Sequence, residues 1–304
     1  MTEQSGAGLP AEKKMHAEGT NACEYAVEMI GITKRFPGIV ANDNITLQLK
    51  KGEIHALLGE NGAGKSSAIK SILGINKFDD GEITFDGIPI SELSHRDKSR
   101  IGSVLDEISL PIDLNVTQLG KVTKNMICGW DDETYSKLCD RFALPRDRAI
   151  KEFSHGTKAK TALAVALSHN ADTLILDEPT SGLDPVARDE ITDILYDFMQ
   201  DESHSVLISS HITSDLEKLC DRIVFIHDGS VILNEQKDEI SEKYGVAHCE
   251  SVERSGIPEK AIVRVRKHAY GMDILTYLPE APRAVTERIG LEELMLFLIK
   301  GEKR

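Results

Sequence analysis

The spacing of hydrophobic and polar residues divides the first part of the chain into short strands and one strand–loop–helix unit. Residues 25–32, 45–49 and 81–87 carry the short apolar or alternating runs that are typical of strands. A further apolar run at residues 54–58 is followed, after a glycine-rich segment, by a helical pattern over residues 67–73. This pattern predicts a strand that leads through a tight loop into a helix.

The middle of the chain is predicted to be helical, and strand–helix alternation resumes after it. Helical spacing covers residues 116–127, 131–144 and 157–169. One face of the second helix carries Tyr135, Leu138, Cys139 and Phe142. The resumed alternation predicts strands at residues 173–176, 206–208, 223–226 and 231–233 and helices at residues 186–199 and 214–219. The continuous apolar run of the first of these strands suits a parallel sheet that is covered on both faces.

Beyond residue 243 the pattern is weaker, with a strand at residues 261–265 and a closing helix at residues 291–299. The chain as a whole is therefore predicted to have an α/β fold. We expect a disordered leader at 1–23, a main α/β domain at 24–243 with a helical subdomain at about 105–168, and a small accessory α/β domain at 244–304.

Charge and hydropathy exclude some classes of partner. The 304 residues carry a net charge of −14, whereas nucleic-acid binding requires a basic surface, so no nucleic-acid partner is expected. No apolar run approaches the roughly 18–20 residues that cross a bilayer, so no direct membrane insertion is expected. The N-terminus has no apolar core, which argues against a signal peptide. The 5 cysteines form no C-x-x-C pair, so we expect reduced cytosolic thiols and no zinc site.

The glycine-rich segment at residues 59–67 reads Gly-Glu-Asn-Gly-Ala-Gly-Lys-Ser-Ser and fits the phosphate-loop pattern G-x-x-x-x-G-K-[ST] at every fixed position. Its glycines allow the backbone to wrap a triphosphate with N–H groups pointing inward, at the start of a helix. Lys65 would place a positive charge on the β- and γ-phosphates, and the Ser66 hydroxyl would bind Mg²⁺. The alternative is a chance glycine-rich turn. The candidate nucleotide-binding residues here are Gly59, Asn61, Gly62, Ala63, Gly64, Lys65, Ser66 and Ser67.

Two acidic residues follow the apolar run that ends near residue 176. Asp177 stands where a Walker B aspartate would hold Mg²⁺, and Glu178 could polarise an attacking water as general base. His211 follows a later apolar strand, at a place from which it could reach a γ-phosphate. The alternatives are two solvated acids and a structural histidine. With Lys65, these residues are the candidate catalytic and metal-binding groups.

In their order, these motifs resemble those of the nucleotide-binding subunits of ABC transporters over roughly residues 25–240. The resemblance implies an ABC-type P-loop NTPase, with a RecA-like parallel sheet, an antiparallel β subdomain and an inserted helical subdomain. It implies that Phe36 stacks on adenine and that His211 is the switch histidine. Ser154 and Gly156 remain in a degenerate signature, Phe-Ser-His-Gly-Thr, and Asp184 belongs to the D-loop. Asp106 stands where the family has the Q-loop glutamine, and as a carboxylate it can also bind Mg²⁺.

A finer resemblance is to the subgroup that serves ABC-2-type exporters, including subunits encoded beside GntR-type regulators. This likeness rests on the Ser-x-Gly-Thr-Lys signature and on four short segments, at residues 129–131, 167–169, 226–229 and 291–294. It implies export as the direction of transport.

The resemblance also implies partners and a location. Two subunits would pair head to tail around two ATP molecules, as a homodimer or with a paralogue. A separate integral membrane permease would hold the subunit at the cytoplasmic face of the membrane. Residues 105–130 would line the groove for a basic and apolar segment of that permease; the alternative is that they form only the core and rim of the helical block. The alternatives are a soluble ABC-type ATPase in a non-transport role, and a P-loop kinase or GTPase, which the absence of an Asn-Lys-x-Asp motif disfavours.

Overall fold

The computed structural model describes residues 23–106, 110–251, 256–281 and 286–302. Apart from Cys23, the leader expected at residues 1–23 lies outside these residues. In chain order the elements are β1 (Tyr25–Phe36), β2 (Ile39–Lys50), β3 (Ile54–Leu58), α1 (Lys65–Ile72), β4 (Asp80–Phe85), β5 (Ile88–Pro89), α2 (His95–Lys98), β6 (Ile101–Val104), α3 (Val116–Lys124), α4 (Asp132–Arg141), α5 (His155–Ala166), β7 (Thr173–Asp177), α6 (Pro185–Phe198), β8 (Ser205–Ser210), α7 (Thr213–Leu219), β9 (Arg222–His227), β10 (Ser230–Gln236), α8 (Lys237–Lys243), β11 (Tyr244–Cys249), β12 (Ile262–His268), β13 (Gly271–Tyr277), β14 (Glu287–Arg288) and α10 (Leu291–Lys300).

A six-stranded sheet in the order β10-β9-β3-β8-β7-β6 forms the centre of the molecule. Its strands run parallel except β10, which pairs antiparallel with β9. Every residue of β3, β7 and β8 is buried, which for β7 confirms the predicted strand covered on both faces. Because the strands are parallel, β3, β7 and β8 end at the same edge of the sheet, where the phosphate loop, Glu178 and His211 follow them.

One face of this sheet is covered by α1 and by a four-stranded antiparallel sheet in the order β2-β1-β4-β5. The apolar face of α1 packs between the two sheets, together with Leu57 of β3 and Ile175 of β7. The helix that carries the end of the phosphate loop is thus fixed from both sides. The buried members of this cluster are Ala26, Val27, Met29, Ile32, Ile45, Leu47, Leu49, Leu57, Ala63, Ala68, Ile69, Ile72, Ile83, Phe85, Ile175, Leu207, Val224 and Ile226.

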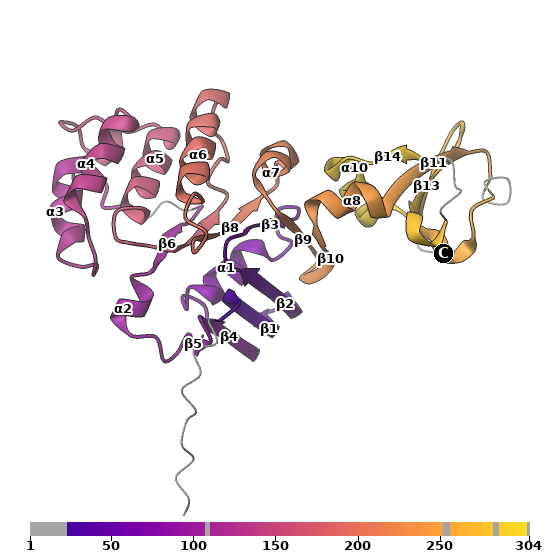
Figure 1. The fold of residues 1–304 in the computed structure, drawn as a ribbon, viewed down its shortest axis with the longest axis horizontal. Helices are drawn as coiled ribbons and strands as arrows, with labels where there is room; N and C mark the ends of the chain where they lie inside the picture. The colour runs from indigo at the N-terminus through magenta and orange to yellow at the C-terminus, as the bar shows by residue number, and fades with distance from the viewer. Residues whose placement is uncertain (1–22, 107–109, 252–255, 282–285, 303–304) are drawn as a thin grey trace, which may run out of the picture.

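The other face packs against helices. Alternate residues of β3 and β7 belong to one buried core cluster with residues of α6 and α7, and this cluster includes residues of α3, α4 and α5. Figure 1 shows α3, α4, α5 and α6 side by side as one block. The predicted apolar face of α4 is confirmed, with Tyr135, Cys139 and Phe142 buried and Leu138 partly buried. A Cβ at Gly120 of α3 would lie 2.6 Å from the Tyr135 ring, so α3 and α4 approach this closely only because that residue is glycine.

The C-terminal residues form a third sheet, in the order β12-β13-β11-β14, at the end of the molecule opposite α3 and α4 (Figure 1). Helix α10 packs on α7, and Leu294 and Phe297 join the core cluster that contains Leu216 of α7. The backbone N–H of Leu291 donates to Glu217 Oε1 over 3.0 Å, so an acidic side chain of α7 caps the N-terminus of α10. This lobe therefore contacts the helix that follows His211.

The structure differs from the sequence prediction in the extent of several elements. Strand β1 runs on to Phe36, beyond the predicted end at residue 32, and α5 begins at His155 and not at residue 157. Strands β6, β11 and β13 were not predicted. In β6, a Cβ at Gly102 would lie 2.6 Å from Leu174 of β7, so close packing against neighbours, and not an apolar run, defines this strand. In β11 and β13 the apolar residues neither alternate strictly nor form a continuous run, so they give no strand pattern along the chain.

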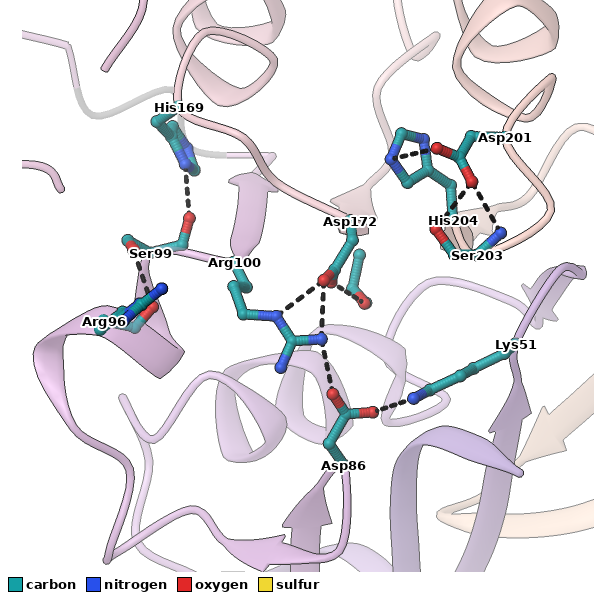
Figure 2. Close-up of polar contacts among 11 residues, drawn as sticks. Lys51, Asp86, Arg96, Ser99, Arg100, His169, Asp172, Asp201, Ser203 and His204 are labelled. Atoms are coloured by element: carbon teal, nitrogen blue, oxygen red, sulfur yellow. Dashed lines mark hydrogen bonds and ion pairs between the residues drawn. The ribbon is translucent and has the colours of Figure 1, made fainter. Parts of the chain in front are cut away.

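A polar network joins the antiparallel sheet to the central sheet (Figure 2). The Arg100 guanidinium lies between Asp172 and Asp86, with distances of 2.6 and 2.5 Å to their carboxylate oxygens. Asp86 in turn contacts Lys51 Nζ at 2.7 Å. Arg100 precedes β6 and Asp172 precedes β7, so the network fixes the entry to two core strands.

Replacing Phe297 by alanine should test whether α10 is part of the core. Phe297 is 0 % exposed, so Phe297→Ala should lower the free energy of unfolding by about 3–5 kcal/mol, measured by urea denaturation. The matched control is Tyr270→Ala, because Tyr270 is 93 % exposed and its loss should change stability by less than about 0.5 kcal/mol. A loss below about 1 kcal/mol for Phe297→Ala would show that the buried ring contributes little.

Candidate nucleotide-binding site

The loop between β3 and α1 has the backbone geometry of a phosphate cradle. Gly62 and Gly64 have φ angles of 85° and 110°, in the region that favours glycine. A Cβ at Gly64 would lie 2.3 Å from the Ala41 carbonyl oxygen, and a Cβ at Gly59 would lie 2.5 Å from that of Ile226. These close approaches allow no side chain, so the loop can adopt this path only with glycine at both places.

A cavity of about 570 Å³ lies over this loop. It brings together most of the residues that the sequence singled out: Phe36, Asn61, Gly62, Gly64, Lys65, Ser66, Ser67, Asp106 and Glu178. Gly59, Ala63, Asp177 and His211 lie beside or behind the cavity and are not among its lining residues. Sequence reasoning missed Ile39, Val40, Ala41, Glu60, Asp228 and Gly229, which also line it. Glu60 is a variable position of the phosphate loop, and Asp228 and Gly229 belong to the segment 226–229, which was noted only for its likeness to the exporter subgroup. Ile39, Val40 and Ala41 lie in no motif and reach the site through the pairing of β1 with β2.

Phe36, at the end of β1, is 41 % exposed and lines the cavity. Lys34 Nζ lies 4.8 Å from the centre of the ring. Ile39 and Val40, across the turn between β1 and β2, are also exposed apolar residues of the cavity wall. This end of the cavity is therefore suited to a flat aromatic group, whereas the loop end is suited to an anion.

Lys65 is buried, and its charge is held inside the loop. Its Nζ donates to the carbonyl oxygen of Gly59 over 2.7 Å and lies 3.3 Å from Glu178 Oε1. A buried cation needs such partners. The lysine thus connects the phosphate loop to the first residue after β7.

Asp177, Glu178 and His211 form a second connected group at the same sheet edge. Asp177 is 1 % exposed, and its Oδ1 accepts a hydrogen bond of 2.6 Å from the Ser209 hydroxyl of β8. Glu178 has a φ of 50°, which turns its side chain out of the strand direction. His211 Nδ1 lies 2.7 Å from Glu178 Oε2. A carboxylate that is oriented by a histidine and faces a lysine can accept a proton from a water molecule beside a phosphate.

Ser154, Gly156 and Asp184 are not brought to this cavity. Ser154 is exposed and caps α5, because its Oγ accepts a 3.1 Å hydrogen bond from Thr157 N–H. Asp184 is exposed and caps α6 by accepting from the N–H groups of Val186 and Ala187 at 3.0 Å. The Ala187 N–H bond is the main reason why the pKa of Asp184 is below its usual range. Within one chain, these residues are separate from the phosphate loop.

The parallel sheet, the glycine cradle and the carboxylates at the sheet edge define a P-loop nucleoside triphosphatase. Comparison with known proteins then narrows the class. The family model described as ABC transporter matches residues 42–181. The lantibiotic transport ATP-binding protein SrtF of Streptococcus pyogenes is 37 % identical over 198 residues, which cover 64 % of this chain and 84 % of that protein. The chain therefore belongs to the family of ABC transporter ATP-binding subunits, and its activity is ATP hydrolysis linked to transport.

Solved structures agree with this assignment. An ATP-binding subunit of an ABC transporter superposes with a TM-score of 0.65 at 25 % identity, over 71 % of this chain and 92 % of that one. A dimeric bacterial ABC transporter cassette superposes with a TM-score of 0.63 at 22 % identity, over 69 % and 98 % of the two chains. The predicted fold, an ABC-type P-loop NTPase with its antiparallel subdomain and helical subdomain, is confirmed. No helix in the described part of the chain is long and apolar enough to cross a membrane.

Replacing Glu178 by glutamine should separate nucleotide binding from hydrolysis. The amide keeps the size of the side chain but cannot accept a proton, so ATP turnover should fall by about 10²-fold or more while ATP still binds. Phosphate release and equilibrium binding measure the two quantities. The matched control is Glu60→Gln, which removes an exposed carboxylate from the same cavity and should leave turnover within a few fold. Normal turnover of Glu178→Gln would rule out Glu178 as the general base.

Proposed function

We propose a specific division of roles in this ATPase site. The adenine stacks on Phe36, the N–H groups of residues 62–67 and Lys65 hold the phosphates, and Glu178 activates the attacking water, oriented by His211. The observation that carries this proposal is the continuous contact from the Gly59 carbonyl through Lys65 and Glu178 to His211, with distances of 2.7, 3.3 and 2.7 Å. It connects the phosphate end of the cavity to a base and to the group that orients the base.

We propose Mg²⁺ as the metal of the site. Mg²⁺ usually keeps several waters and takes one or two protein oxygens together with phosphate oxygens, so a hydroxyl and a carboxylate at the loop are enough. The Ser66 hydroxyl lines the cavity, and Asp177 lies directly before Glu178 at the end of β7. When bound, the ion would neutralise charge on the β- and γ-phosphates. Asp106 lines the same cavity and is an additional candidate ligand.

We further propose a head-to-tail dimer, formed with a second copy or a paralogue. Ser154 and Gly156 stand at the N-terminus of α5, away from their own phosphate loop, and a helix N-terminus favours a phosphate. In a head-to-tail pair they would face the γ-phosphate of the partner subunit, and Asp184 would lie at the same interface. The dimeric cassette described above supports this arrangement by its fold.

The docking surface for the membrane permease is proposed at two cavities that share lining residues, between the antiparallel sheet and the helical block. Their volumes are about 980 and 300 Å³, and both are lined by Lys98, Ile101 and Ser103. Of the expected segment 105–130, the described residues that line them are 126–128, and most of the lining comes from residues 72–103. Basic side chains outnumber acidic ones in the lining of these cavities, which includes Lys77, His95, Lys98 and Glu82. We therefore propose that the permease segment that docks here is apolar and not basic.

Transport would then take place at the cytoplasmic face of the cell membrane, with the subunit peripheral to it. We propose export as the direction, supported by the motif likeness to the ABC-2-type subgroup and by the similarity to a protein of lantibiotic transport. The ATPase domain is proposed to span residues 24–243. Residues 244–304 are proposed as an accessory domain that packs on α7 through α10.

Purification from detergent-solubilised membranes, followed by mass spectrometry, tests the transport role. We expect a polytopic membrane protein in stoichiometric amount. Ile75→Asp should remove it, because Ile75 is 58 % exposed in the larger cavity, whereas Tyr270→Asp, at the far end of the molecule, should retain it. The ATP affinity of each purified variant verifies its fold. If the wild-type protein purifies as a dimer without any membrane protein, the result would favour a soluble ABC-type ATPase.

Replacing Asp106 by glutamine distinguishes two roles for this residue. If Asp106 links the site to the permease, Asp106→Gln should change permease-stimulated ATPase activity by several fold and leave the basal rate and its Mg²⁺ dependence unchanged. We expect this result, because Asp106 lies two residues after the end of β6, whose Ile101 and Ser103 line the permease cavities. A rise in the Mg²⁺ concentration needed for half-maximal basal activity would instead assign Asp106 to the metal.

A further inference from the structure

Asn42 is a buried amide in β2, beside the phosphate loop, and belongs to none of the motifs. Its side chain is 0 % exposed, and its Nδ2 donates to the carbonyl oxygen of Gly64 over 3.0 Å. Its Oδ1 is buried and accepts no hydrogen bond within the part of the chain that the structure describes. Because a buried acceptor without a partner lowers stability, an apolar residue would fill this place at a smaller cost. The amide therefore has a use other than packing.

The carbonyl group of Gly64 is held from two directions. Besides Asn42, the N–H of Ala68 donates to it over 3.0 Å as the first hydrogen bond of α1. The peptide bond is planar and trans, so the N–H of Lys65 points opposite to this carbonyl group. When Asn42 and Ala68 fix the Gly64 carbonyl, they also fix the direction of the Lys65 N–H, which is one of the groups available to a phosphate.

The preceding peptide group is fixed in the same way. The N–H of Gly229 donates to the carbonyl oxygen of Ala63 over 2.9 Å, which sets the direction of the Gly64 N–H. The turn that contains Gly229 is itself connected to β2, since the Asp43 N–H donates to the Gly229 carbonyl oxygen over 2.8 Å. Two consecutive N–H groups of the loop are thus oriented by hydrogen bonds from outside the loop. One of these bonds comes from a side chain, and that side chain is Asn42.

We propose that Asn42 is a positioning residue of the ATPase site, which directs the Lys65 N–H toward the phosphates of ATP by holding the Gly64 carbonyl group. Asn42 acts through Gly64 and not on the nucleotide, since it is not among the described residues that line the cavity. The inference rests on the phosphate-loop role proposed above. It predicts that loss of the Asn42 amide weakens binding of the phosphates and leaves binding of the adenine unchanged.

The test compares Asn42→Leu with a matched control on the same strand. Leucine has a similar size but no donor, so the affinity for ATP and for ADP should fall by about fivefold, the equivalent of one ordinary hydrogen bond. The KM for ATP should rise by the same factor, and kcat should change by less than twofold. The inhibition constant of adenosine, which has no phosphates, should stay constant. Gln48→Met removes an amide that donates to Glu28 Oε1 over 2.9 Å, away from the loop, and should change none of these quantities.

The melting temperature and a second variant keep the test decisive. Asn42→Leu should melt at the wild-type temperature or above it. If Asn42→Leu does not fold, Asn42→Ala should show the same selective loss of ATP over adenosine affinity. Unchanged ATP affinity in Asn42→Leu overturns the proposal, and so does an equal loss of ATP and adenosine affinity. Lys65→Ala serves as the reference. Wild-type ATP affinity in Lys65→Ala would overturn the phosphate-loop role itself. Weakened ATP affinity in Lys65→Ala together with wild-type ATP affinity in Asn42→Leu would overturn only the role of Asn42.

Discussion

The site depends on one constraint: the phosphate loop must be held open with its N–H groups inward and no side chain in the way. Gly64 meets the backbone of β2 so closely that a Cβ would lie 2.3 Å from the Ala41 carbonyl oxygen. Gly59 meets the backbone of β9 in the same manner. The central sheet, the antiparallel sheet and α1 are all arranged around these two approaches. The buried part of the loop has the carbonyl groups of Ala63 and Gly64 hydrogen-bonded by its neighbours, which fixes its path, and a fixed path is what an anion site needs.

The second requirement is a base that stays in place beside a cation. Lys65 is buried and Glu178 nearly so, and their charges are 3.3 Å apart, which is a more effective arrangement than the same pair would make at the surface. His211 holds the other oxygen of Glu178 at 2.7 Å. Because β7 and β8 are parallel neighbours, the two residues that follow them meet without any direct link in sequence. The parallel sheet thus brings Glu178 and His211 together.

The C-terminal lobe contacts the helix that follows the catalytic edge of the sheet. Helix α10 packs on α7, and α7 begins 2 residues after His211. Glu217 of α7 supplies the N-terminal cap that α10 lacks, since Gly290 has no side chain to offer. The lobe is therefore not an independent appendage, because its helix shares the core cluster that covers one face of the central sheet.

Much of the fold and site follows from local sequence. The run at residues 173–176 predicted a buried parallel strand because both its faces are apolar, and the run at 54–58 predicted the strand before the phosphate loop. The nine residues of the loop were recognisable from their spacing. Glu178 and His211 were recognisable because acidic residues and a histidine follow apolar strands. What the tertiary structure alone decided is the set of residues that support the loop. Asn42 lies in no motif, and Gly229 was noted only for its likeness to the exporter subgroup. Their role at the loop arises because pairing of β1 with β2, and of β9 with β10, places them against Gly64 and Ala63. Strand β6 likewise owes its existence to close packing at Gly102, since contacts between distant segments leave no periodic pattern along the chain.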